Sequence, residues 1–393
     1  MKSGACPMSA ISQIRDRTSQ AKAWLCDHAL PLWWETGFDR ANGLFHEQMT
    51  LDGTPVPMSR RIRVQARQTF VYATAGRIGW DGPWREVAAA GAEALLRHAF
   101  HPGGGTIFSL DETGQPKNTS RDLYDVAFVV FALAHAGAAL KRDDCLAAAT
   151  GLLDWTYANW SHPAGGFLEG DLTPAPPRRQ NPHMHMMEAL LALHEATGDQ
   201  QHLKRAGDIA NLFSAKLLNQ RAGVLLEYFD DAWNPAPGDE GRITEPGHQF
   251  EWSWLLDRYQ RAGGHDVSAE ASAIYDHGET FGVDPATGVT FDEVWAEGGV
   301  RTRTSRLWPH AERIKANIIR VEANRDPVAA ARVVQAFDML MTYCDLPVKG
   351  LWRDRRNPDG SFIDQPAPAS SLYHIALAMA ELIRVANLLD ANL

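Results

Sequence analysis

The sequence predicts an all-α protein of the (α/α)6 type, with six inner and six outer helices and short β-hairpins at one end. Two observations lead to this fold class. A Gly-rich turn between short β-like runs occurs six times, and the stretches between the turns have helical periodicity. The turn glycines are Gly43, Gly105, Gly166, Gly223, Gly288 and Gly360, so the gaps are 62, 61, 57, 65 and 72 residues. Such gaps accommodate two helices and a hairpin.

The intervals between the turns have the apolar spacing and the residue types of helices. Residues 185–198 and 371–390 place their large apolar side chains on one stripe at the 3.6-residue period. Residues 121–139 and 143–159 form a clear helix pair, and residues 10–37 supply an amphipathic opening helix. Six pairs can close into a ring. The alternative is an open solenoid, although solenoid repeats are shorter.

Composition and charge exclude several classes of protein. The chain has 393 residues, no Pro/Gly/Ser-rich linker and a net charge of −10. We therefore expect one domain over residues 1–393, with a flexible N-terminus at 1–9, and no nucleic-acid partner. Four scattered cysteines and the lack of a leader or a long apolar stretch predict a cytoplasmic protein with no membrane partner. We expect a monomer or homodimer.

Motifs for nucleotide binding, for serine hydrolases and for zinc proteases of the HExxH type are missing from the sequence. We therefore expect no cofactor.

Residues suited to binding sugars or moving protons recur near the start of the helix that follows each turn. If the repeats are equivalent, these residues lie at one height of the barrel and surround one mouth, which is a natural small-molecule pocket. They are Arg67, Tyr124, His185, His248, Trp308 and His374.

Two of these residues are histidines with distinctive surroundings. His248 and Glu251 are three residues apart and share a helix face, so the carboxylate can fix the imidazole tautomer and raise its basicity. His374 lies in an apolar run, where desolvation lowers the pKa of an imidazole and keeps a neutral base available.

The other candidates leave alternatives open. Arg67, one turn after Arg63, either extends to the surface or anchors a sugar oxygen. Trp308 is either a stacking wall or a packing residue at a helix start. His183 and His185 form an HxH pair, but the spacing indicates no third ligand, so we expect no metal.

Six segments resemble the N-acylglucosamine 2-epimerase superfamily over nearly the whole chain. They are VQARQTFVYA, DLYDVAFVVFALA, NPHMHMMEALLAL, EPGHQFEWSWLL, RLWPHAERIKA and SLYHIALAMAEL. The resemblance implies an (α/α)6 barrel that transfers protons without a nucleotide cofactor in catalysis. The implied catalytic residues are His248 with Glu251, His374, and Arg67 as the oxygen anchor. The implied substrate-binding residues are Asn181, His185, Trp308, Tyr124 and Glu312. His310 stands where many relatives have glutamine.

The resemblance implies a sugar isomerase, and the ARQTFVYA and GHQFEWSWLL segments favour an unphosphorylated hexose, D-mannose to D-fructose, through a cis-enediolate. A 2-epimerase of the N-acylglucosamine, mannose/glucose or cellobiose type is the alternative, because two bases serve either outcome. A glycoside hydrolase would need two carboxylates, for which Asp122, Asp125 and Glu251 are candidates. A non-catalytic sugar-binding protein is the third class.

Overall fold

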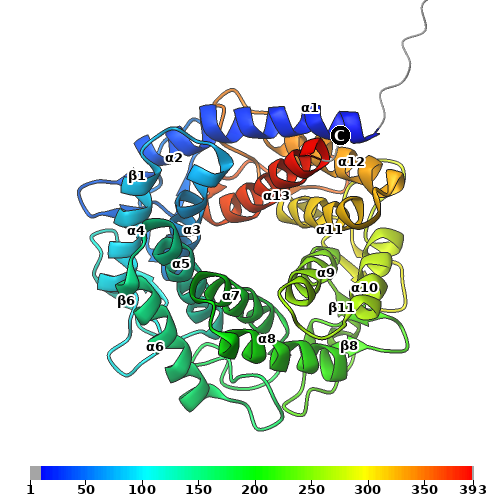
Figure 1. The fold of residues 1–393 in the computed structure, drawn as a ribbon, viewed down its shortest axis with the longest axis horizontal. Coiled ribbons are helices and arrows are strands. Elements are labelled where there is room, and N and C mark those ends of the chain that lie inside the picture. The colour runs from blue at the N-terminus through cyan, green and yellow to red at the C-terminus, as the bar shows by residue number, and fades with distance from the viewer. Residues whose placement is uncertain (1–9, 392–393) are drawn as a thin grey trace, which may run out of the picture.

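The helices form two concentric rings (Figure 1) in the computed structural model, which describes residues 10–391. The inner helices are α3 (Ile62–Ile78), α5 (Leu123–Leu140), α7 (Asn181–Thr197), α9 (Pro246–Arg261), α11 (Trp308–Asn324) and α13 (Leu372–Ala391). The outer helices are α1 (Ala10–Ala23) with α2 (Leu30–Glu35), α4 (Trp84–His98), α6 (Asp143–Trp160), α8 (Gln200–Leu212), α10 (Ser268–Phe281) and α12 (Pro327–Tyr343). The predicted (α/α)6 class is confirmed.

The sequence of the inner helices explains their position. Thirteen of the eighteen residues of α5 are buried, because a helix enclosed by neighbours on most sides needs apolar residues around most of its circumference. For the same reason, residues 123–140 and 369–389 are long and apolar enough to cross a membrane, at mean hydropathies of 1.8 and 1.4. The expectation that no segment reaches this threshold was therefore wrong. Both segments are mostly buried within the ring.

The opening segment differs in detail from the single predicted helix. A π-helical stretch, Trp24–Ala29, separates α1 from α2 and buries Trp24, Leu25 and Ala29. A second π-helical stretch, Phe213–Leu217, follows α8. The predicted flexible N-terminus, residues 1–9, lies outside the described residues.

All six turn glycines adopt left-handed backbone conformations, with φ between +63° and +89°. Side chains other than hydrogen are disfavoured there, which is why glycine recurs at these positions. Each glycine lies in a short hairpin. Two hairpins contain paired strands, β1 (Phe38–Asp39) with β2 (Leu44–Phe45) and β8 (Leu218–Asn219) with β9 (Val224–Leu225). The other four are closed by the isolated bridges Phe100–Thr106, Ser161–Phe167, Val283–Thr290 and Arg356–Phe362.

A second set of antiparallel pairings joins each repeat to the next. The pairs are β4 (Arg60–Arg61) with β5 (Ser109–Leu110), β7 (Arg178–Arg179) with β10 (Tyr228–Phe229), β11 (Ile243–Thr244) with β12 (Glu293–Trp295), and β14 (Ser305–Arg306) with β15 (Arg355–Arg356). β6 (Pro116–Asn118) and β13 (Val300–Thr302) add a third strand to two of these sheets. The bridge Asp122–Gly170 joins the second and third repeats.

The last pairing closes the ring. β16 (Ala367–Pro368) pairs with β3 (Gln48–Met49), so the sixth repeat is bonded to the first. An open solenoid would leave both of these strands unpaired, and that alternative is excluded. The same hairpin end carries two short 3₁₀ turns, Glu240–Arg242 and Ala369–Ser371.

Buried glutamines fix the start of two inner helices against their hairpins. The Gln65 amide both accepts from the Phe45 N–H, at 2.8 Å, and donates to its carbonyl, at 2.9 Å. Gln249 does the same at Leu225, at 3.1 and 2.9 Å. Because a buried amide with both ends satisfied has one favourable orientation, these contacts define the height at which α3 and α9 begin.

Candidate active site

Each inner helix contributes one of the six predicted residues, close to its N-terminal end. Tyr124, His248, Trp308 and His374 lie in the first turn of their helices, and Arg67 and His185 lie in the second. The six helices begin at the same hairpin end, so the side chains gather at one mouth of the barrel. The equivalence of repeats inferred from the sequence therefore holds at the level of the site.

His248 is held by carboxylates from outside its own helix. Its Nδ1 lies 2.9 Å from Glu227 Oε2 and 3.9 Å from Glu245 Oε2. A carboxylate only accepts, so Nδ1 carries the proton and donates it to Glu227. Burial disfavours the charged imidazole, but Glu227 and Glu245 outweigh it and raise the pKa of His248 to about 9. His248 is therefore protonated at neutral pH and can act as an acid.

The expected partner of His248 was Glu251, and here the sequence interpretation was wrong. Residues three apart share a helix face, but the hairpin places Glu227 directly on the imidazole. Glu227 also accepts the backbone N–H of Glu245, as Glu47 and Glu169 accept those of Arg61 and Arg179 in other repeats. A glutamate shortly after the turn glycine was the signal that could have identified it.

His374 has a carboxylate partner of a different kind. Its Nδ1 donates to Glu312 Oε1 at 2.7 Å, and the other oxygen of Glu312 lies 2.6 Å from Lys315 Nζ. Lys315 and Glu312 are fully buried. Burial, together with the cations of Arg67 and Lys315, lowers the pKa of His374 well below its ordinary value. Its Nε2 has no hydrogen bond to any described residue, so His374 can act as the predicted neutral base. Glu312, which was expected as a sugar contact, holds this imidazole in place.

Trp308 lies between the two histidines. Its ring centroid is 5.1 Å from that of His248 and 5.4 Å from that of His374. A side chain at Gly247 would come within 2.4 Å of the indole, so only glycine allows this approach. Trp308 thus separates the two imidazoles, and its indole can offer a face for the C–H groups of a sugar.

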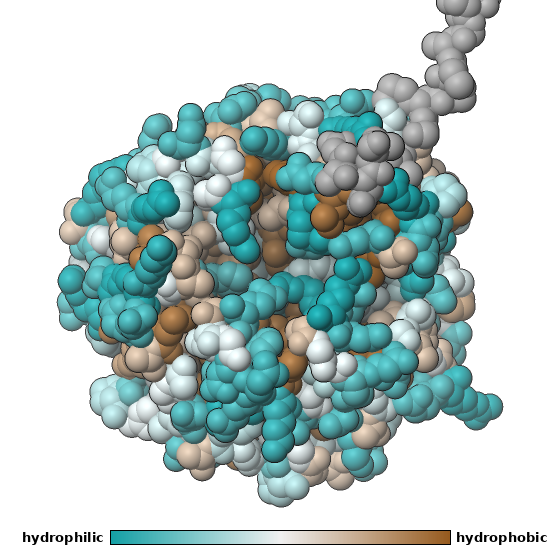
Figure 2. Space-filling view, in the orientation of Figure 1, coloured by the Kyte–Doolittle hydropathy of each residue, from teal (hydrophilic) through white to brown (hydrophobic). Residues whose placement is uncertain are grey.

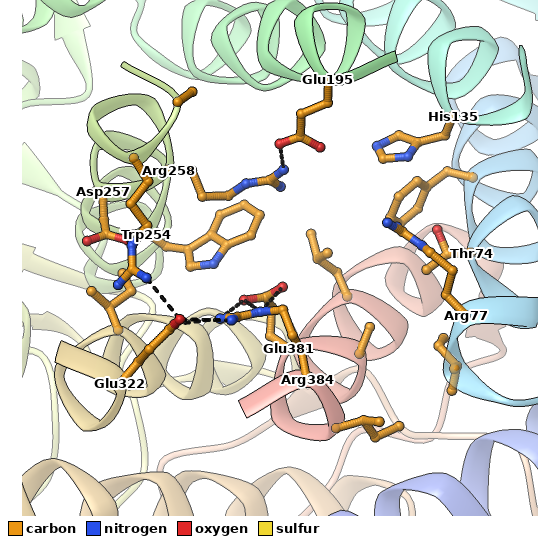
Figure 3. A pocket seen from close by; sticks show the side chains of 18 of the residues that line it. Thr74, Arg77, His135, Glu195, Trp254, Asp257, Arg258, Glu322, Glu381 and Arg384 are labelled. Carbon is orange, nitrogen blue, oxygen red and sulfur yellow. Dashed lines mark hydrogen bonds and ion pairs between the residues drawn. The ribbon is translucent and has the colours of Figure 1, made fainter. Parts of the chain in front are cut away.

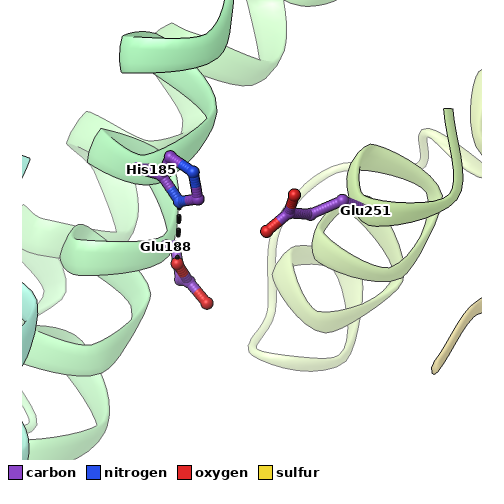
Figure 4. Close-up of side chains that lie close together, drawn as sticks. All are labelled: His185, Glu188 and Glu251. Atoms are coloured by element: carbon purple, nitrogen blue, oxygen red, sulfur yellow. Dashed lines mark hydrogen bonds and ion pairs between the residues drawn. The ribbon is translucent and has the colours of Figure 1, made fainter. Parts of the chain in front are cut away.

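A third imidazole lies beside two further carboxylates (Figure 4). His185 Nδ1 is 3.1 Å from Glu188 Oε2 on α7, and Glu251 faces this pair from α9. Burial lowers the pKa of His185 to about 4, so it is neutral. Burial, with Glu312 and Glu188 nearby, raises the pKa of Glu251 well above its ordinary value, and one of its oxygens has no partner in the part of the chain that the structure describes. A protonated Glu251 can donate a hydrogen bond to a substrate oxygen.

The structure corrects the reason given for expecting no metal. His183 points elsewhere, accepting from the Phe167 N–H at 2.9 Å, but His185 does have carboxylates beside it. Among the described residues, three groups have potential ligand atoms within 4.8 Å of one another: His185, Glu188 and Glu251; Glu227, Glu245 and His248; and Glu251, Glu312 and His374. Metal independence therefore remains a prediction that needs its own test.

Arg67 points into the site and does not extend to the surface. It is 6% exposed, donates to the Tyr124 hydroxyl at 2.6 Å and to the Ser370 carbonyl at 3.3 Å, and lies over the Phe128 ring at 4.2 Å. Its Nε has no partner among the described residues. The guanidinium is therefore held in place with a donor left for a substrate oxygen.

Asn181, expected to bind substrate, and His310, which stands where glutamine was expected, have different surroundings. Asn181 starts α7 with a buried Oδ1 that has no partner among the described residues, which suits a binding role. His310 is buried in the wall against Thr290 and Ser305, at 3.3 and 3.2 Å. Its imidazole is engaged there, and burial lowers its pKa to about 3.

Two of the three carboxylates proposed for glycoside hydrolysis, Asp122 and Asp125, are engaged by Arg63. Arg63 donates to both oxygens of Asp125, at 2.8 and 2.9 Å, and to Asp122 at 3.2 Å. Asp122 also caps α5 by accepting the Tyr124 N–H. Two carboxylates bound to one arginine are poorly placed to flank a glycosidic bond.

The fold and this site define a helical barrel with two carboxylate-bound histidines at one mouth, and comparison with known proteins identifies its family. The model of the N-acylglucosamine 2-epimerase (GlcNAc 2-epimerase) family matches residues 43–378. The chain belongs to this family, and it is a sugar isomerase or epimerase.

Individual relatives agree with that class. The chain is 38% identical to a mannose-6-phosphate isomerase of Rhizobium meliloti (strain 1021), over 94% of this chain and 97% of the relative. It is 28% identical to a D-mannose isomerase of Thermobifida fusca, over 78% and 81% of the two chains. A cellobiose 2-epimerase from Bacillus thermoamylovorans B4167 has the same fold, with a TM-score of 0.87, 20% identity and coverage of 94% and 99%.

Proposed function

We propose that the chain interconverts D-mannose and D-fructose, both unphosphorylated, by proton transfer through a cis-enediol without a metal or organic cofactor. The observation that carries this proposal is the opposite tuning of the two histidines. Glu227 and Glu245 keep His248 charged, whereas burial and Lys315 keep His374 neutral. An acid and a base are thus ready at the same pH, on either side of Trp308.

In the proposed reaction, His374 Nε2 removes the proton from C2 of the open-chain aldose while His248 donates a proton to O1. The product of this step is the neutral cis-enediol. His248 then removes the O2 proton and the His374 imidazolium delivers its proton to C1, which gives the ketose and restores both histidines. Arg67 and the protonated Glu251 supply hydrogen bonds to the oxygens on which negative charge develops.

The charges around the mouth favour an unphosphorylated sugar. Arginines near the mouth are already paired with carboxylates: Arg61 with Glu47, Arg63 with Asp122 and Asp125, Arg179 with Glu169, and Arg306 with Glu245 and Asp292. Arg67 is the exception, because among the described residues it bonds only the neutral Tyr124 hydroxyl and Ser370 carbonyl and keeps one donor for a substrate oxygen. A phosphate dianion that needs more than this one donor would have to displace one of these pairs, since phosphate recognition in proteins depends on available cationic donors. The proposal thus departs from the phosphorylated substrate in the name of the relative from Rhizobium meliloti.

The second candidate is 2-epimerisation. The two histidines have independent partners and lie on either side of Trp308, so His248 can return a proton to the opposite face of C2 instead. The groups that bind the substrate would be the same in both reactions.

A substrate panel tests this proposal. Purified protein is incubated separately with D-mannose, D-glucose, N-acetylglucosamine, cellobiose and mannose 6-phosphate, and products are identified by ¹³C NMR. We expect fructose from mannose, with a higher kcat/KM than for any other member. A higher kcat/KM for mannose 6-phosphate contradicts the charge reasoning, and epimers as the main products favour the second candidate.

A further inference from the structure

The barrel has a cavity of about 740 Å³ at the end opposite the histidines. Its walls come from the middle and C-terminal parts of the inner helices, where Phe70, Phe131, Trp254 and Leu377 supply apolar surface. Figure 2 shows the molecular face hollowed near its centre, with hydrophobic side chains inside the hollow and hydrophilic ones around it. None of the residues proposed for proton transfer lines this cavity.

Two groups of ion pairs line the side of the cavity formed by α7, α9, α11 and α13 (Figure 3). Together they contain three arginines and four carboxylates, so they carry one excess negative charge. The contacts are Arg258 with Glu195, Arg261 with Asp257 at 2.6 Å and with Glu322 at 2.9 Å, and Arg384 with Glu322 at 2.7 Å and with Glu381 at 3.0 Å. Carboxylates have more lone pairs than these contacts use, and they can accept hydrogen bonds from hydroxyl groups.

The facing wall carries polar groups without partners. Arg77 is exposed and makes no hydrogen bond or ion pair with any residue in the described part of the chain. Thr74, one turn earlier on α3, is 2% exposed, and its buried hydroxyl has no partner within residues 10–391. His135 packs against Phe70 and Phe131, and burial, reinforced by Arg77, lowers its pKa to about 3. This wall thus offers one uncompensated cation beside neutral hydrogen-bonding groups.

We propose that this cavity binds a hydroxylated small molecule with a single oxyanion, the chemistry shared by sugar phosphates and sugar acids. The oxyanion pairs with Arg77, and hydroxyl groups donate to the carboxylates of the opposite wall. The C–H face of the ligand lies on Phe70 and Leu377. The preference is opposite to that of the histidine end, where the neighbouring arginines are already paired. This inference does not depend on the reaction proposed above.

Isothermal titration calorimetry on the full chain tests the site with four probes. They are glucose 6-phosphate, gluconate, neutral glucose and inorganic phosphate. We expect at least one of the two hydroxylated anions to bind more tightly than both glucose and inorganic phosphate. Binding of the phosphate ester alone, of the acid alone or of both identifies which oxyanion the site accepts, and each of these outcomes supports it.

Arg77→Gln is the diagnostic variant, with Arg97→Gln on the outer helix α4 as its control. Arg97 is also exposed and without a hydrogen bond or ion pair in the described chain, but it does not line the cavity. Arg77→Gln should weaken binding about tenfold, the order expected for a charge-assisted hydrogen bond, and Arg97→Gln should leave it unchanged. Both variants should keep the kcat and KM of sugar interconversion. The proposal is overturned if neither anion binds, if glucose or inorganic phosphate binds as tightly, or if Arg77→Gln binds like wild type.

Discussion

Replacing Lys315 by methionine should turn the neutral base His374 into a more basic group. Methionine keeps an unbranched side chain on Trp254, above whose ring the ammonium lies at 4.1 Å, but it removes the positive charge. The negative charge of Glu312 then stabilises protonated His374 without a competing cation, because the ammonium 2.6 Å from its second oxygen is gone.

The expected size of the change follows from Coulomb's law. Two unit charges about 6 Å apart, at an effective dielectric constant of about 20, interact by about 2.8 kcal/mol. A pKa unit corresponds to about 1.4 kcal/mol, so the pKa of His374 should rise by about 2 units. In the wild type this pKa lies well below its ordinary value, so the base stays neutral throughout the physiological range. As the pH falls, the variant should therefore lose activity at a higher pH than the wild type does.

The assay is the pH profile of kcat/KM for sugar interconversion between pH 4 and 9. In Lys315→Met we expect the acidic limb to move up by about 2 units, and Lys315→Arg, which keeps the charge, should restore the wild-type limb. Thermal unfolding at pH 7 checks that both variants are folded. An acidic limb unchanged in a folded Lys315→Met protein would refute the view that Lys315 keeps His374 neutral.

Three further outcomes follow from the same geometry. Glu227→Gln should move the alkaline limb of the kcat/KM profile down from about pH 9 by about 1–3 units. His248 must be protonated to act, and this variant removes its nearest anion. An alkaline limb that does not move would mean that a group other than His248 sets it. Arg67→Lys should lower kcat strongly and leave thermal stability nearly unchanged, since an ammonium cannot replace a planar guanidinium, and wild-type kinetics would remove Arg67 from the site. Activity should survive exhaustive EDTA treatment, and a loss restored by a divalent cation would show that the carboxylate and histidine groups hold a metal.

The fold and the membership of the site could be predicted because both repeat along the chain. Glycine at six left-handed turns is a local requirement, visible at positions such as Gly43 and Gly360. Once the repeats were aligned, the residues one turn into each inner helix had to share one height, which placed His248 and His374 at one mouth.

The partners of these histidines could not be predicted in the same way. Glu227 lies 21 residues before His248, and Glu312 lies 62 residues before His374, so neither contact follows from the period of a helix. The protonation states depend on these partners and on Lys315, which looks like an ordinary charged residue in the sequence. The cavity at the opposite end is also a property of packing, because its lining residues have no common spacing.

The central claim is that two histidines move the C2 proton of a sugar, and deuterium transfer in D₂O tests it most directly. Wild-type protein, His248→Ala and His374→Ala are each incubated with D-mannose, and deuterium in the products is located by NMR. We expect deuterium at C1 of fructose with the wild type, and a rate at least about 10²–10⁴ lower in each variant, the range attributed to general acid–base catalysis. Solvent deuterium absent from every sugar carbon, or variants that exchange as fast as the wild type, would contradict the two-histidine mechanism.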